Sequence, residues 1–276
     1  MLRALRRCPG ARRGKRADRC RTRWLVADAR GFAPVTAQSW RHIGPEPRKG
    51  GIVLVADHAS NAVPPDIDLG IDPALLHEHI AVDIGVDAVA EDLARNSGIP
   101  AHLACVSRLV CDLHREEDNP AVIPEASDGH AIPGNIGIDR EARLARFHRP
   151  YHDALAAWLD AADPALVISL HSFTPALRSA PAPRPWEVAL LYNRDDRAAR
   201  HAIKLFEEHG LKVGDNEPYS GRLLNATMNR HAEAHGRPYL AIEVRQDLIT
   251  DAAGQARWAA LIGKVAGQVA ILLEAA

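Results

Sequence analysis

The feature that most constrains the fold is a regular alternation of short β-branched runs with helical segments between residues 51 and 274. Fully buried parallel strands are continuous apolar runs, and amphipathic helices connect them. The alternation predicts an α/β fold, in which helices flank both faces of a single-domain, central mixed and mostly parallel sheet. The expected strands are 51–56, 101–106, 109–113, 166–170, 188–192 and 239–244, and the expected helices are 73–80, 83–97, 140–162, 195–209, 222–235 and 251–274.

The first 30 residues differ in charge from the rest of the chain. They hold eleven Arg or Lys against Asp18 and Asp28, a balance of +9, so the remaining 246 residues carry −10 of the net charge of −1. We expect residues 1–45 to be a basic, disordered extension or an upstream stretch that is translated from an early start codon, and residues 46–276 to be the folded domain. A targeting peptide and a nucleic-acid arm are alternatives, although the acidic body opposes nucleic-acid binding.

Several classes of protein are excluded by missing patterns. The chain has no run of eighteen apolar residues and no apolar core of a secretory signal, so we expect neither a membrane span nor export but a cytoplasmic protein. Its four cysteines form no Cys-x-x-Cys pair, which argues against a cysteine-based zinc site. A Gly-x-Ser-x-Gly elbow, a phosphate-binding loop and a dinucleotide fingerprint are also missing, so Ser60 is a weak nucleophile candidate.

Two of the expected strands end directly in a histidine, His58 after Leu54–Asp57 and His171 after Val167–Leu170. Ligands of open α/β sheets collect beyond the carboxyl ends of the strands. Imidazole is a good ligand for Zn²⁺, and for other divalent metals. A single histidine at such a place is more often structural, but two at equivalent places predict a metal site.

A third metal ligand is expected to be a carboxylate or another histidine. Asp83 lies at the start of an expected helix, where it could be a ligand or simply the N-cap of that helix. Asn61 lies three residues after His58, where a zinc peptidase has Glu. Because an amide is a poor zinc ligand, Asn61 is expected to support the loop or contact the substrate, as is the adjacent Ser60.

Charged residues near other strand ends are candidates for catalysis and substrate binding. Glu243 closes the strand before Val244 and Arg245, so it could act as general base or acid, or could pair with Arg245. Arg245 is also a candidate for substrate binding. Period-two spacing places Arg108 and Asp112 on one face of a strand, as a buried ion pair or as part of a clamp for a substrate carboxylate. Of the remaining histidines, His231 is the one expected to approach the site. The long loop 115–138 is expected to be functional or mobile.

Four ordered blocks resemble the N-formylglutamate amidohydrolase family. They are Val55–Asn61, Ser107–Arg115, Ser169–Phe173 and Ile242–Leu248, and the resemblance covers nearly all of residues 50–273. It implies a fold similar to that of zinc carboxypeptidases and phosphorylases. It also implies hydrolysis of an N-acyl amide such as N-formyl-L-glutamate, which gives formate and the free amino acid in histidine degradation.

The resemblance also implies roles for individual residues. His58 and His171 match the metal-binding blocks, Glu243 matches the catalytic carboxylate, and Arg108 or Arg115 matches the substrate clamp. In carboxypeptidases the third ligand is the Glu three residues after the first His, which is Asn61 here. Either Asp83 substitutes for it, or the metal has fewer protein ligands and more water.

Two other functions are compatible with the same residues. The chain could be a related zinc hydrolase that acts on another acyl-amino acid or on a cell-wall amide. It could also be a binding module of the same fold that has lost catalysis, which the absent His-x-x-Glu glutamate favours. In every case the expected partner is a small molecule rather than nucleic acid or a membrane, and the sequence leaves the oligomeric state open.

Overall fold

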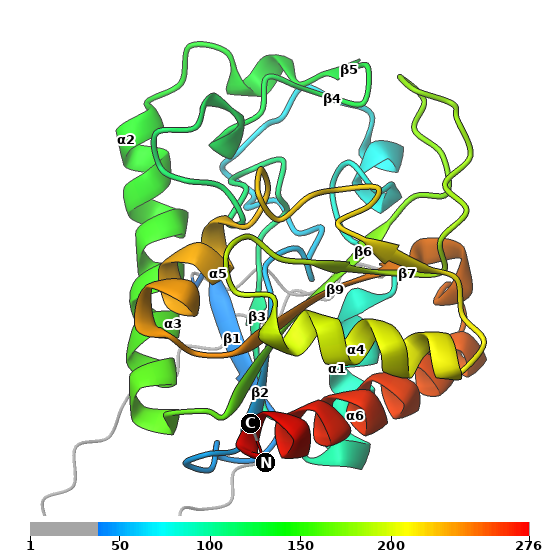
Figure 1. Ribbon diagram of the computed structural model, residues 1–276. Helices are drawn as coiled ribbons and strands as arrows, with labels where there is room; N and C mark the ends of the chain where they lie inside the picture. Colours follow the sequence, from blue (N-terminus) through cyan, green and yellow to red (C-terminus); the bar gives the residue numbers. More distant parts are fainter. Residues whose placement is uncertain (1–37, 276) are drawn as a thin grey trace, which may run out of the picture.

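Seven strands form one mixed sheet in the computed structural model, which describes residues 38–275 (Figure 1). The strand order is β1-β3-β2-β6-β9-β7-β8. The four central strands β3, β2, β6 and β9 are parallel, whereas β1 is antiparallel at one edge and β7 and β8 are antiparallel to β9 at the other. The strands are β1 Trp40–Ile43, β2 Ile52–Ala56, β3 Ala101–Ala104, β6 Leu166–Phe173, β7 Val188–Leu191, β8 Val213–Asp215 and β9 Tyr239–Arg245.

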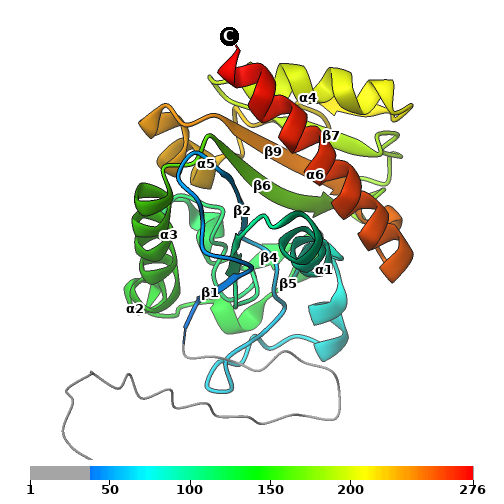
Figure 2. The same cartoon turned by 90° about the horizontal axis from the view of Figure 1, so that it is seen from below.

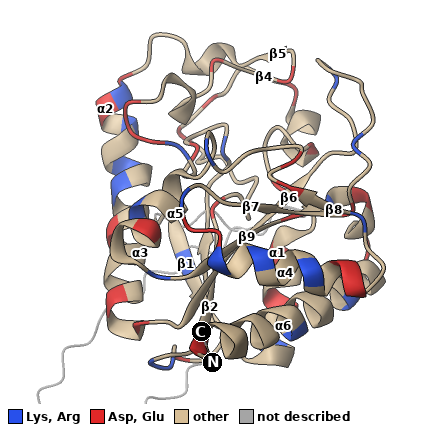
Figure 3. Ribbon diagram, in the orientation of Figure 1, with Lys and Arg blue, Asp and Glu red and all other residues tan. Residues whose placement is uncertain are grey.

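Helices cover both faces of this sheet, which confirms the predicted α/β architecture (Figure 2). One face is covered by α4 and α6 together with α1, and the opposite face by α3 and α5. The exposed sides of α2 and α4 carry both acidic and basic residues (Figure 3). The helices are α1 Val86–Asp92, α2 Arg140–Arg143, α3 Arg149–Ala162, α4 Arg197–Glu208, α5 Ala226–His231 and α6 Ala252–Glu274, and π-helical turns at Leu93–Ser97 and Leu144–His148 extend α1 and join α2 to α3.

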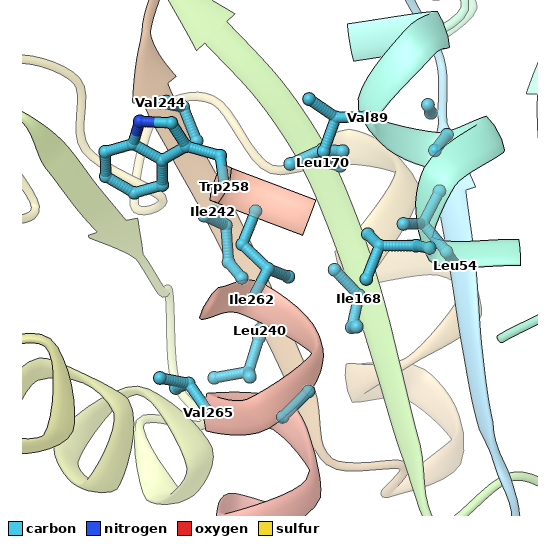
Figure 4. Close-up of a cluster of buried hydrophobic side chains, with 14 of the residues drawn as sticks. Leu54, Val89, Ile168, Leu170, Leu240, Ile242, Val244, Trp258, Ile262 and Val265 are labelled. Carbon is cyan, nitrogen blue, oxygen red and sulfur yellow. The ribbon is translucent and has the colours of Figure 1, made fainter. Parts of the chain in front are cut away.

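The two hydrophobic cores follow from the alternation of side chains along each strand. In β2, Leu54 belongs to the core under α1 and α6, whereas Val53 and Val55 belong to the core under α3. Figure 4 shows the first core, in which Ile262 of α6 lies between strand residues such as Ile168 and Leu240. Both faces of the central strands are therefore buried, and only the strand ends are available for a polar site.

Helix α6 is long and apolar enough, by length and composition alone, to cross a membrane. In this fold its apolar side packs against the sheet, where Trp258, Ile262, Val265 and Val269 are all buried. Its buried apolar side therefore belongs to the core, whereas Ile271 and Leu272 near its end are exposed.

The sheet begins before the domain boundary that was expected at residue 46. β1 pairs with β3 from Trp40↔Ala104 to Ile43↔Ala101, so residues 40–43 belong to the sheet. A four-residue edge strand shows no periodicity that could distinguish it from the preceding basic segment. The expected disorder concerns residues 1–37, which lie outside the described residues.

The strand expected at 109–113 was wrong. Residues 107–110 form a turn, in which the amide of Leu109 donates to Ser107 Oγ and the amide of Val110 donates to the carbonyl oxygen of Ser107. Serine stabilises turns in this way, and the turn competes with extended backbone. The short strand β8 was missed, and the expected helices at 73–80 and 222–235 are shorter, because 3-10 turns occupy Pro73–His77 and Glu233–His235.

The long loop 115–138 contains short regular elements. The 3-10 turns Pro120–Val122 and Pro133–Asn135 flank a two-stranded hairpin, formed by β4 Ala126–Ser127 and β5 His130–Ala131. This hairpin lies at the end of the molecule toward which the central parallel strands run (Figure 1). It is therefore close to the strand ends that bear the candidate site.

Candidate active site

The polar side chains of the site come from the carboxyl ends of β2, β6 and β9, which are neighbours in the sheet. His58 follows β2 by two residues, and His171 lies in β6 directly opposite Glu243 of β9. Both strands continue two residues beyond these positions. Parallel pairing thus brings together three groups that are far apart in the sequence.

His58, His171 and Asp83 form a buried cluster. His171 Nδ1 lies 2.8 Å from Asp83 Oδ2, and His58 Nδ1 lies 3.4 Å from the same oxygen. All three side chains are no more than 6% exposed. One ligand atom from each lies within 4.8 Å of the others, which suits a single metal ion.

Asp83 is placed by its own backbone and by the turn that follows. Its amide donates to the carbonyl oxygen of His58 at 3.0 Å, which ties it to the end of β2. Gly85, and not Asp83, is the N-cap of α1, and its φ of 83° lies in the left-handed region that favours glycine. The carboxylate of Asp83 is therefore free of the capping role that was its alternative interpretation.

Two further carboxylates contact the outer ring nitrogens of the histidines. Asp112 Oδ1 lies 2.7 Å from His58 Nε2, and Asp57 Oδ2 lies 3.7 Å from His171 Nε2. Burial lowers the pKa of His58, as does Arg108, but Asp112 and Asp83 outweigh both and raise it to about 9. The cluster thus favours positive charge at its centre.

Arg108 connects two of these carboxylates. Its Nη1 donates to Asp83 Oδ1 at 3.2 Å and its Nη2 donates to Asp112 Oδ2 at 3.1 Å. Arg108 and Asp112 meet across a turn rather than along the strand that the spacing predicted. The neighbouring Arg115 lines the same cavity and has one ion-pair contact there, 3.5 Å from its Nε to Asp112 Oδ2.

Asp57, His114 and Tyr151 belong to the site, although they were not expected there. Asp57 is fully buried, and it accepts hydrogen bonds from Tyr151 Oη at 2.6 Å and His114 Nδ1 at 2.8 Å. His114 also lies 3.1 Å from Thr227 Oγ1. The signals in the sequence were weak: Asp57 adjoins His58, and His114 follows Asp112 by two residues.

Glu243 is almost buried at 9% exposure, and its Oε2 has no hydrogen-bond partner in the part of the chain that the structure describes. Burial raises the pKa of this carboxyl well above its ordinary value, and the charge of Asp83 adds to the effect. Arg245 does not pair with Glu243, because its guanidinium contacts Asp247 and the carbonyl oxygen of Trp186.

A cavity of about 220 Å³ exposes these groups. Five residues that were expected to bind substrate do not line it. Asp112 instead contacts His58 and Arg108. Ser60 and Asn61 line a different cavity beside α1. The guanidinium of Arg245 contacts Asp247 and the carbonyl oxygen of Trp186, and the buried His231 contacts His152 at 2.9 Å. The cavity is lined by His58, Asp83, Arg108, His114, Arg115, His171 and Glu243, with His79, Asp128, Leu177, Ser179 and Tyr219 among the other wall residues.

Helices cover both faces of a mixed sheet, and histidines and carboxylates cluster at the carboxyl ends of its parallel strands, so the chain is an α/β protein with a polar site at a sheet edge. Residues 50–250 match the model of the family described as N-formylglutamate amidohydrolase. The chain therefore belongs to the N-formylglutamate amidohydrolase family, as the four sequence blocks indicated.

Solved structures agree with this assignment. A gene product from Agrobacterium tumefaciens is 30% identical with a TM-score of 0.80, over 86% of this chain and 96% of that chain. The N-formylglutamate amidohydrolase from Ralstonia eutropha is 22% identical with a TM-score of 0.65, over 86% of this chain and 98% of that chain, which shows a shared fold. None of the curated proteins compared matches this chain.

Proposed function

We propose that the chain is a metal-dependent amidohydrolase that cleaves the amide bond of a small N-acyl amino acid. The candidate substrate is N-formyl-L-glutamate, which would give formate and glutamate in histidine degradation in the cytoplasm. The observation that carries the proposal is that ligand atoms of His58, Asp83 and His171 lie within 4.8 Å of one another. They share a cavity with Glu243, whose Oε2 has no hydrogen-bond partner within residues 38–275.

The residues present fit a divalent cation. Asp112 holds Nε2 of His58, so the lone pair of Nδ1 can point toward Asp83 and the site centre. Two imidazole nitrogens and one carboxylate oxygen are a usual donor set for catalytic zinc, which leaves room for water or substrate. We therefore propose His58, Asp83 and His171 as the metal ligands and Zn²⁺ as the metal, with other divalent ions as alternatives.

When bound, the cation would supply Lewis acidity for the acyl carbonyl and for the attacking water. Glu243 is the proposed general base: it accepts a proton from the water and passes it to the leaving nitrogen. A raised pKa suits this exchange because the group must both take up and release a proton near neutral pH.

The two arginines have different proposed roles. Both terminal nitrogens of Arg108 contact carboxylates, so this residue orients Asp83 and Asp112 and adds positive charge beside the reacting carbonyl. Arg115 lines the cavity with fewer competing contacts, so we assign it the substrate carboxylate. Ser60, Asn61, Arg245 and His231 have no part in this proposal, because they lie outside the cavity.

The test is elemental analysis of the purified protein combined with hydrolysis of N-formyl-, N-acetyl- and N-succinyl-L-glutamate. We expect about one metal ion per chain and a loss of turnover after chelation, as for one three-ligand site. His171→Ala should abolish both metal uptake and hydrolysis, whereas His201→Ala on α4, which does not line the cavity, should affect neither. Full activity of an exhaustively chelated protein would refute the proposal.

A further inference from the structure

The tip of the β4–β5 hairpin brings Asp128 close to the cavity. Ser127 pairs with His130, so Asp128 and Gly129 form a two-residue turn, with φ values of 42° and 80°. Asp-Gly is a preferred pair for this tight turn, because both positions need positive φ. The hairpin therefore fixes where the side chain of Asp128 is placed.

Asp128 joins three segments that are far apart in the sequence. Its Oδ1 accepts hydrogen bonds from the amide of Ser179 at 2.8 Å and from Ser179 Oγ at 2.6 Å. Its Oδ2 accepts from the amide of Arg178 at 2.9 Å and lies 3.0 Å from His79 Nε2. The Asp128 side chain is only 6% exposed although it lies on a hairpin tip, because the loop after β6 covers it.

These contacts hold one wall of the active-site cavity. Leu177 and Ser179 of the loop, His79 and Asp128 itself all line the cavity. The loop lies beside the hairpin tip and has no strand or helix between residues 174 and 187 (Figure 1). Other contacts of this loop to distant residues include Arg178 Nη1 with His130 Nε2 of the hairpin at 3.0 Å. Arg184 stacks on Tyr219 and donates to Tyr219 Oη, and Arg245 Nη1 donates to the carbonyl oxygen of Trp186.

We propose that Asp128 is a positioning residue that determines substrate size: it fastens residues 177–179 over the cavity and so restricts the site to small acyl groups. The proposal rests on the amidohydrolase function proposed above. A wall that is held by four contacts to one carboxylate is rigid, and rigid walls discriminate between substrates that differ in length. If the carboxylate is removed, the loop should move outward and admit longer acyl chains.

The test compares Asp128→Gly with Asp163→Gly in the full chain. Glycine keeps the positive φ that the turn needs and removes only the side chain. Asp163 also has a positive φ, of 41°, but caps the end of α3 away from the cavity, so it is a matched control. Asp128→Asn is the conservative variant, because its amide oxygen can still accept hydrogen bonds from Ser179.

Two quantities are measured: kcat/KM for N-succinyl- against N-formyl-L-glutamate, and amide hydrogen exchange of residues 174–180. We expect Asp128→Gly to raise the succinyl-to-formyl ratio by about tenfold, which is typical of a change of one or two methylenes in a pocket. Exchange at 178 and 179 should accelerate, Asp128→Asn should be intermediate in both measurements, and Asp163→Gly should match the wild type.

Each outcome decides the proposal. An unchanged substrate ratio despite faster exchange would overturn the role in specificity, and unchanged exchange would show that Asp128 does not hold the loop. If the wild-type protein hydrolyses none of these substrates, the proposed function fails. In that case hydrogen exchange still decides whether Asp128 fastens the wall, because it requires no turnover.

Discussion

Carboxylates next to His58 and His171 determine how the two imidazole rings are oriented in the site. His58 and His171 each have one ring nitrogen directed toward Asp83 and the other toward a second carboxylate, Asp112 or Asp57. Carboxylates that contact the outer nitrogen of a histidine orient the ring and strengthen it as a ligand. The outer carboxylates should therefore affect metal affinity without contacting the metal.

Asp112→Asn tests this effect at the residue scale. The amide oxygen can still accept the hydrogen bond from His58 Nε2, but the negative charge is lost, so we expect metal affinity to fall about 10- to 100-fold. A competition titration with a chelator of known affinity measures the change. Asp247→Asn, which alters an exposed ion pair with Arg245, is the control. Equal affinity of Asp112→Asn and the wild type would contradict the prediction.

Glu243→Gln tests the proposed general base. Glutamine has nearly the same shape but cannot take up the proton, so kcat should fall by a factor on the order of 10² to 10⁴ while bound metal stays the same. Glu208→Gln at the exposed end of α4 should leave kcat unchanged. Turnover close to the wild-type value in Glu243→Gln would show that another group acts as the base.

At the scale of elements, the site depends on how the segment before α1 packs against Ile249, which follows β9 and the 3-10 turn Gln246–Leu248. Gly85 begins α1 with a positive φ, and a Cβ there would lie 2.3 Å from the carbonyl oxygen of Ile249. This close approach places Asp83, two residues earlier, beside His171. The position of Asp83, the third proposed ligand, thus depends on Gly85. A glycine is required there because this segment packs closely against the distant Ile249.

Gly85→Ala should destabilise the protein and weaken metal binding. The left-handed φ and the clash with Ile249 together should lower the free energy of unfolding by about 2–4 kcal/mol. Gly98→Ala is the matched control: its φ is 65°, but a Cβ there meets nothing within 4 Å, so a loss of only about 1 kcal/mol is expected. Denaturant unfolding measures both, and equal losses would refute the packing argument.

At the scale of the whole molecule, buried histidines outside the cavity make the free energy of unfolding depend on pH. Burial, and secondarily Arg230, lower the pKa of His231 to about 4. His152 Nε2 must donate to the carbonyl oxygen of Leu113, so its Nδ1 accepts from His231 Nε2 and both rings are neutral. His231 therefore stabilises the fold fully above the unfolded pKa of about 6.5 and loses that contribution as the pH falls toward 4.

The unfolding free energy should therefore decrease between pH 7 and pH 5, and about 2 kcal/mol of this loss should come from His231. His231→Gln keeps a donor toward His152 but has no titrating group. The free energy of unfolding of this variant should therefore change by about 2 kcal/mol less between pH 7 and pH 5 than that of the wild type. Denaturant unfolding of both proteins at pH 7, 6 and 5 measures the difference. Parallel pH curves would exclude His231 as the source.

The sequence by itself determined the elements that local pattern controls. Apolar β-branched runs predicted the five strands β2, β3, β6, β7 and β9, and the polar groups at their ends predicted that His58, His171 and Glu243 would lie at one edge of the sheet. These inferences hold because parallel strands place their carboxyl ends together. The four ordered blocks also indicated the family to which the chain belongs.

Tertiary structure decided what depends on contacts between distant segments. The edge strand β1 pairs with β3 across about 60 residues, and Asp83 turns toward His171 because Gly85 packs on Ile249. Asp57 and His114 entered the site, whereas Ser60, Asn61 and His231 lie outside its cavity. Local spacing sets the direction of a side chain relative to its own element, but only packing sets which groups meet in three dimensions.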